Sequence, residues 1–226
     1  MCQSCSGHGQ HRRHADDRPE TARVQGCQGN RLNTTEKTTL DAATVYLLPG
    51  LHGRLERGLG AELLARGLSV TGRETVGGFD DLPFAEQVRT VADDLMASFW
   101  HPQARVIANS FGAYLFLNAQ TLIEPFPGRV LLLSPLIGEG ENPATGQAFT
   151  LPGSDQFEQI LEASLFPAPR SLEVHVGELD WQANPARWQE LAANLGFDLF
   201  VVPNGKHRLD HGYVASVLDR WLPQPL

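Results

Sequence analysis

The fold of this chain is decided by the stretch Val106-Ile107-Ala108-Asn109-Ser110-Phe111-Gly112-Ala113-Tyr114-Leu115-Phe116-Leu117. A short apolar run that begins with β-branched residues ends at Ala108-Asn109, Ser110 follows at once, and helix-compatible residues begin at Gly112. The pattern predicts a strand, a sharp turn with Ser110 at its apex, and then a helix. Ala108 and Gly112 are small, as such a turn requires, because it forces the backbones of the strand and the helix together.

Ser110 stands in the pattern AxSxG, which differs by one methyl group from the GxSxG of a nucleophile elbow. A buried serine at a strand-to-helix turn is also a common structural feature without any chemistry. The motif therefore needs support from other parts of the chain.

Two later stretches place an acid and a histidine directly after predicted strands. Asp180 lies in the turn after residues 171–176, and His207 lies in the loop after residues 197–202. In open α/β sheets, ligands bind at the carboxyl edge, where these turns meet. We therefore expect Ser110, Asp180 and His207 to gather at that edge.

This arrangement resembles the α/β-hydrolase fold family, in which nucleophile, acid and histidine follow one another in this order. The resemblance covers roughly residues 43–223. It implies an α/β fold with a mostly parallel central sheet of about six strands flanked by helices, and a catalytic triad of Ser110, Asp180 and His207. It also implies an oxyanion hole formed by the backbone N–H groups of Leu51 and Phe111.

The remaining elements follow from apolar runs and helical spacing. The predicted strands cover residues 44–48, 68–71, 105–109, 129–133, 171–176 and 197–202. The predicted helices cover residues 60–66, 83–99, 112–119, 185–195 and 212–222. The segment between the strands at 129–133 and 171–176 predicts a small cap insertion at about residues 136–170, in which Gly138–Pro143 is expected to be a loop.

The acid and the histidine of the predicted triad each have a rival. Glu178 is the alternative acid, but it lies closer to its strand than Asp180 and is less able to reach across. His211 is the alternative histidine, but it falls at the start of the last helix and is expected to point elsewhere. His175 lies inside a strand, which predicts a hydrogen-bonded structural residue.

Three residues are candidates for contact with a substrate. Phe149 and Leu151 offer apolar surface for an acyl or alcohol pocket, although packing onto the sheet would explain them as well. His52 lies in the loop after the first strand, where a structural role competes with substrate binding.

Composition excludes several classes of protein. The 226-residue chain carries a net charge of −8 and no basic stripe, so a nucleic-acid partner is not expected. No apolar run has the length of a membrane span. The three cysteines all precede the domain predicted over residues 43–226, so its core contains none. No metal or organic cofactor is implied.

Residues 1–42 are polar and contain almost no large apolar side chains, which predicts a disordered tail. Metal-ligating residue types recur there at every third position, namely Cys2, Cys5, His8, His11 and His14. Structural zinc sites are usually two pairs of ligands separated by a longer loop, so a solvated tail is the favoured interpretation. The tail lacks a basic start and an apolar stretch, which argues against a secretory signal and predicts a cytoplasmic protein.

Two functional interpretations remain open. The first is a serine hydrolase that cleaves a small carboxylic ester or thioester through an acyl-enzyme on Ser110. The second is a non-catalytic binding protein of the same fold, because a fold alone does not establish an activity. The sequence does not determine the oligomeric state.

Overall fold

The computed structural model describes residues 44–223, which form an alternating series of strands and helices. The strands are β1 (Thr44–Leu48), β2 (Ser69–Gly72), β3 (Arg105–Asn109), β4 (Arg129–Leu133), β5 (Glu139–Glu141), β6 (Ala148–Thr150), β7 (Ser171–Gly177) and β8 (Asp198–Val202). The helices are α1 (Leu59–Ala65), α2 (Phe84–Ser98), α3 (Phe111–Gln120), α4 (Ser154–Glu162), α5 (Pro185–Leu195) and α6 (His211–Trp221), with a 3₁₀ turn, η1, at Gly77–Phe79. All six predicted strands and all five predicted helices are present, with bounds that differ by only a few residues.

The six longer strands form one parallel sheet in the order β2-β1-β3-β4-β7-β8. The order reverses between β1 and β3, because the chain first adds β2 on one side of β1 and then continues with β3 on the other. Loops that leave the carboxyl ends of β1 and β3 therefore diverge to opposite faces of the sheet and leave a crevice between them. In open α/β sheets, ligands bind in this crevice. Ser110 directly follows β3 and so lies at the crevice.

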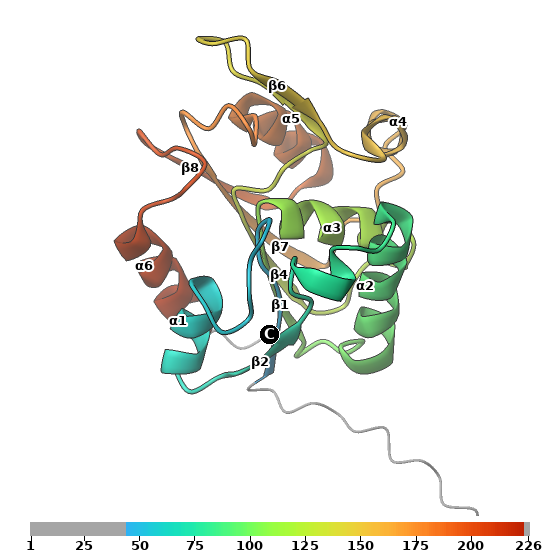
Figure 1. Ribbon diagram of the computed structural model, residues 1–226, viewed down its shortest axis with the longest axis vertical. Helices are drawn as coiled ribbons and strands as arrows, with labels where there is room; N and C mark the ends of the chain where they lie inside the picture. The colour runs from blue at the N-terminus through green and yellow to red at the C-terminus, as the bar shows by residue number, and fades with distance from the viewer. Residues whose placement is uncertain (1–43, 224–226) are drawn as a thin grey trace, which may run out of the picture. The chain divides into compact units, whose positions relative to one another are not determined.

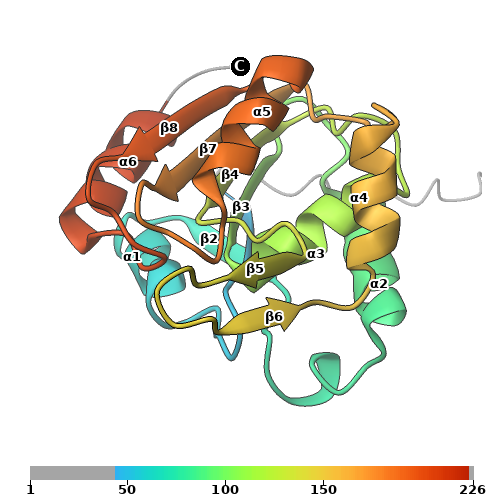
Figure 2. The ribbon, with the colours of Figure 1, turned by 90° about the horizontal axis from the view of Figure 1, so that it is seen from above.

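Both faces of the sheet are covered, as Figures 1 and 2 show. Along β1, Val45 and Leu47 pack into the cluster beneath α1 and α6, whereas Tyr46 and Leu48 pack into the cluster beneath α2, α3 and α5. This alternation is the two-residue period of a strand with apolar side chains on both faces. It explains the continuous apolar runs that predicted the strands.

The cap insertion differs from the prediction at one point. Gly138–Pro143 was expected to be a loop, but Glu139–Glu141 is β5, which pairs antiparallel with β6. The Phe149 ring covers Gly140, its partner in the hairpin, so closely that a Cβ on Gly140 would lie 2.7 Å from the ring. Figure 2 shows this hairpin crossing over the carboxyl edge of the sheet, followed by α4.

Two sequence-based predictions concern residues that the structure does not describe. Residues 1–42, for which disorder was predicted and which contain the cysteine and histidine pattern, lie outside residues 44–223.

Among residues 44–223, no helix combines the length and the apolar character that crossing a membrane requires.

Candidate active site

Ser110 lies at the turn between β3 and α3 in an unusual backbone conformation. Its φ of 52° and ψ of −117° belong to a region that L-residues rarely occupy, and residues held in such regions cluster at functional sites. The Ser110 N–H donates to Leu133 O at 3.0 Å, and the Tyr114 N–H donates to Ser110 O at 3.1 Å. These bonds hold the serine at the carboxyl edge of the sheet, where the sequence placed it.

The small residues around Ser110 have a direct steric reason. A Cβ on Gly112 would lie 2.2 Å from Leu48 O, because the first turn of α3 packs against the end of β1. Ala108 is completely buried in β3. A side chain larger than hydrogen at position 112 would force the helix away from the strand, as the sequence pattern predicted.

His207 connects the serine to an acid. Its Nε2 lies 2.8 Å from Ser110 Oγ, and its Nδ1 lies 3.0 Å from Asp180 Oδ2. An ionised carboxylate only accepts hydrogen bonds, so the Nδ1–H donates to Asp180 and leaves Nε2 free to accept the serine proton. The structure thus brings together the three residues that the sequence predicted as a triad.

The carboxylate of Asp180 is held in place from several sides. Its side chain is completely buried, and Oδ1 accepts the backbone N–H groups of Gln182 at 3.0 Å and Ala183 at 3.1 Å. A buried charge requires such partners, because a buried acceptor left unsatisfied costs about 1–3 kcal/mol and a charged one costs more. These donors also orient the carboxylate toward His207.

The two loops that carry the acid and the histidine are packed directly on each other. The Leu179 N–H donates to Gly205 O at 2.8 Å. A Cβ on Gly177 would lie 2.4 Å from the carbonyl carbon of Gly205, so the contact requires glycine at position 177. The close approach of these loops sets the distance between Asp180 and His207.

The alternative acid, Glu178, and the alternative histidine, His211, form their hydrogen bonds with residues outside the predicted triad. Glu178 accepts the backbone N–H of Asn204 at 2.8 Å through Oε2. His211 Nε2 lies 2.6 Å from Glu62 Oε1 on α1, and its side chain is 78% exposed. Neither side chain forms a hydrogen bond with Ser110 or His207.

The arrangement of this sheet and its helices matches solved structures, although no family model and no curated protein matches the sequence. The ydeN gene product from B. subtilis superposes with a TM-score of 0.55 at 16% identity, over 80% of this chain and 99% of that chain. Alpha/beta hydrolase domain-containing protein 10 from mouse gives a TM-score of 0.57 at 13% identity, over 78% and 88%. This chain has the α/β-hydrolase fold. The esterase RhEst1 from Rhodococcus sp. shares it, with a TM-score of 0.53 at 14% identity over 81% and 92%.

In this α/β-hydrolase fold, the backbone N–H groups of Leu51, in the loop after β1, and of Phe111, the first residue of α3, have no hydrogen-bond acceptor within residues 44–223. The same holds for the next two N–H groups in the first turn of α3. The β1 loop approaches the serine closely, since a Cβ on Gly50 would lie 3.3 Å from Ser110 Cβ. Leu51 and Phe111 are the residues whose N–H groups the family resemblance implies as an oxyanion hole.

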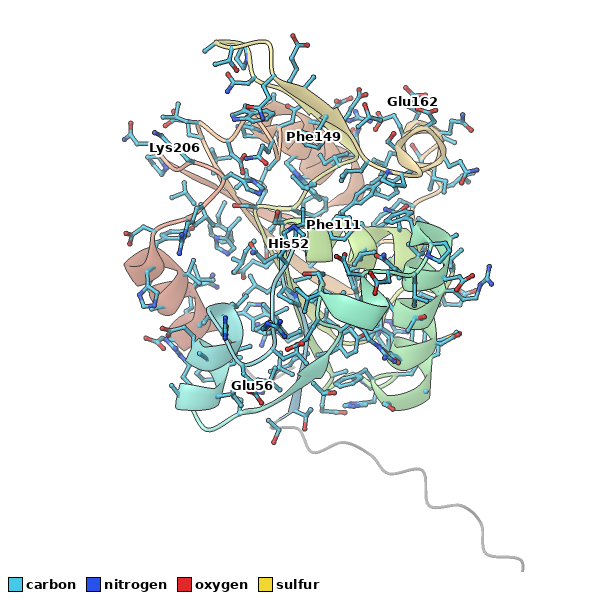
Figure 3. All side chains as sticks on the ribbon, viewed as in Figure 1. His52, Glu56, Phe111, Phe149, Glu162 and Lys206 are labelled. Atoms are coloured by element: carbon cyan, nitrogen blue, oxygen red, sulfur yellow. The ribbon has the colours of Figure 1, made fainter. Side chains whose placement is uncertain are left out.

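The candidate substrate contacts are divided among three places. Phe149 lines a cavity of about 730 Å³ between the β5-β6 hairpin and the loop of Asp180, where its ring centroid lies 5.9 Å from that of Trp181. Leu151 lines a second cavity of about 670 Å³, beside α2 and the start of α4. His52 is exposed in the β1 loop, and Figure 3 shows it with Phe111 at the carboxyl edge of the sheet. Leu151 and Phe149 therefore line different cavities.

A buried polar network links the strand before the acid loop to the helix after the histidine loop. On β7, His175 Nε2 lies 2.7 Å from Glu173 Oε1, and on α6, Tyr213 Oη lies 2.7 Å from His175 Nδ1. Arg220 of α6 forms an ion pair with Glu173 and lies over the ring of Phe200. His175 is thus a hydrogen-bonded structural residue, as predicted.

This network predicts a pH-dependent stability. Burial by itself raises the pKa of Glu173, but the hydrogen bonds from His175 and Arg220 outweigh it and hold that pKa at about 2. The folded-state pKa lies below the ordinary glutamate value, so the stabilisation is complete above about pH 4.5 and is lost as the pH falls toward 2. In urea unfolding across pH 2 to 7, we expect Glu173→Gln to be less stable than the parent at pH 7, and this difference to shrink toward pH 2. A difference that does not change with pH would contradict this assignment.

Proposed function

We propose that this protein is a serine hydrolase that cleaves a small carboxylic ester or thioester through an acyl-enzyme. One observation carries the proposal: the His207 ring bridges Ser110 Oγ at 2.8 Å and Asp180 Oδ2 at 3.0 Å. Activation of a serine hydroxyl requires this geometry, since the base must accept the hydroxyl proton while a carboxylate holds its tautomer.

The first half of the reaction forms the acyl-enzyme. Ser110 Oγ attacks the substrate carbonyl carbon while His207 Nε2 takes the hydroxyl proton, and Asp180 stabilises the imidazolium that results. The negative charge that develops on the carbonyl oxygen is accepted by the N–H groups of Leu51 and Phe111. As the tetrahedral intermediate collapses, His207 gives its proton to the departing alcohol or thiol.

The second half releases the acid. A water molecule, deprotonated by His207, attacks the acyl carbonyl, and the same two N–H groups hold the second oxyanion. Collapse of this intermediate returns the proton to Ser110 Oγ and frees the carboxylic acid. Each step uses residues of this chain and water.

The small cap supports a small substrate. It consists of the β5-β6 hairpin and α4, with no larger helical lid among residues 44–223. The cavity of about 730 Å³ that Phe149 lines is also lined by Asp180, so it lies next to the reacting residues, although Ser110 and His207 are not part of its wall. We assign the acyl or alcohol group of the substrate to this cavity, because pockets of this size with aromatic walls hold small organic groups.

The binding-protein interpretation has weaker support. It requires a blocked or misaligned triad, whereas the two distances at His207 are those of hydrogen bonds. The strained conformation of Ser110 is also the one expected of a nucleophile at a strand-to-helix turn.

Turnover of p-nitrophenyl esters tests the proposal. We expect saturable hydrolysis of the acetate and butanoate esters and of the matching thioesters, with the rate falling as the acyl chain becomes too long for the cavity. The Ser110→Ala protein is the negative control, because it differs from the parent only in lacking the Ser110 hydroxyl. A folded parent that hydrolyses none of these compounds faster than Ser110→Ala would contradict the proposal.

A further inference from the structure

Thr75 is a completely buried residue between β2 and η1 whose hydroxyl contacts the loop after β1. Its Oγ1 donates to Gly50 O and accepts the N–H of Gly53 at 2.8 Å. The Thr75 N–H donates in addition to Gly53 O at 3.1 Å. One threonine thus makes three hydrogen bonds to a turn of four residues.

The turn that Thr75 holds carries one of the two proposed oxyanion donors. Gly50–Gly53 is closed by the Gly53 N–H, which donates to Gly50 O at 2.8 Å, with His52 at a φ of 60°. Leu51 and His52 lie at the centre of this turn. The hydroxyl of Thr75 therefore bridges the same two groups that close the turn.

The hydroxyl sets the direction of the Leu51 N–H through the planarity of one peptide bond. The carbonyl of Gly50 and the N–H of Leu51 belong to the same peptide unit, which is planar and, when trans, points them in opposite directions. A donor that fixes Gly50 O therefore also fixes where the Leu51 N–H points. The orientation matters because Gly50 itself lies against Ser110 and Asn109.

A neighbouring residue supports the same loop further along the chain. Glu74 accepts the backbone N–H of Leu55 at 3.0 Å and pairs with Arg54 at 3.5 Å. The segment after β2 therefore holds the loop after β1 along most of its length. The hydroxyl of Thr75 is the part of this support that contacts the donor peptide itself.

We propose that Thr75 is a positioning residue of the active site: its hydroxyl aims the Leu51 N–H at the oxyanion that forms on a substrate attacked by Ser110. The inference rests on the proposed serine hydrolase function. Sequence reasoning missed this residue, because a threonine in a loop after an edge strand carries no motif.

The substitution Thr75→Val tests the inference, since it removes the hydroxyl and keeps the shape. Loss of one oxyanion donor costs about 10²- to 10³-fold in rate, and a donor that is only misdirected should cost about 10- to 100-fold in kcat with KM nearly unchanged. A second readout is the ratio of kcat/KM for an ester to that for its thionoester. The sulfur of a thionoester is a weak acceptor, so this ratio should fall in Thr75→Val.

The rate ratio separates positioning from folding, because it does not depend on the fraction of active protein. We expect Thr75→Ser, which keeps the hydroxyl, to restore both kcat and the ratio. Thr121→Val is the matched control, since Thr121 Oγ1 also donates to a backbone carbonyl, Asn118 O at 2.7 Å, at the end of α3. This control should keep the parent ratio.

An unchanged kcat and an unchanged ratio in Thr75→Val would overturn the inference, and a lower melting temperature alone would assign Thr75 a purely structural role. If Thr75→Val does not fold, Thr75→Cys takes its place, because it offers only a weak S–H donor. A parent protein without Ser110-dependent turnover would remove the proposed function and this inference together. An active parent whose Thr75 variants have the same kcat and the same rate ratio would instead overturn only the inference about Thr75.

Discussion

Ser110→Ala is expected to lower the rate of ester hydrolysis by about 10⁵- to 10⁶-fold, because removing the nucleophile leaves only binding and the oxyanion donors. A fluorophosphonate probe, which reacts with activated serines, should label the parent on Ser110 and leave Ser110→Ala unlabelled. Peptide mass spectrometry identifies the labelled residue. An adduct on another serine would contradict the assignment of Ser110.

His207→Ala is expected to lower the rate by a comparable factor, because base and nucleophile act as one unit. The hydrogen bond of 2.8 Å to Ser110 Oγ is the path by which the serine loses its proton. His211→Ala is the matched control, since His211 pairs with Glu62 on α1 and should keep the parent labelling rate. Equal labelling of the parent and His207→Ala would contradict the role of His207.

Asp180→Asn is expected to lower kcat by about 10⁴-fold while the protein stays folded. The carboxylate accepts the Nδ1–H of His207, which leaves Nε2 as the acceptor for the serine proton. An amide at this position can donate to Nδ1 and favours the opposite tautomer, in which Nε2 carries the proton. The pH dependence of kcat, measured by p-nitrophenol release, reports this change.

Glu178→Gln is the comparison that decides between the two acids. Glu178 accepts the Asn204 N–H, and a glutamine oxygen can accept the same bond, so the loop should keep its position. We expect a rate within about threefold of the parent, because Glu178 is exposed and its carboxylate forms no hydrogen bond with Ser110 or His207. A large loss in Glu178→Gln together with a small loss in Asp180→Asn would reverse the assignment.

The hairpin of the cap shows where prediction from the sequence failed. Strands of three residues are too short for a two-residue period to be recognised. β5 is stabilised by contacts from outside its own segment: Phe149 covers Gly140 from the opposite strand, and Trp181 packs against Phe149 from the acid loop. None of these contacts can be read from Gly138–Pro143 alone.

The sequence by itself determined the six strands of the sheet and the turn at Ser110, and the resemblance to the α/β-hydrolase fold family implied their parallel order and the roles of serine, acid and histidine. The strands and the turn follow from local causes: apolar runs buried on both faces of a sheet, and glycine at position 112, where the helix meets β1. Only the tertiary structure decided that His207 forms hydrogen bonds with both Ser110 and Asp180, and that neither Glu178 nor His211 takes part. It alone placed Thr75 against the turn of Leu51. The reason is that such contacts join residues far apart in the chain, whose distance is set by how strands and loops pack, and no local pattern encodes it.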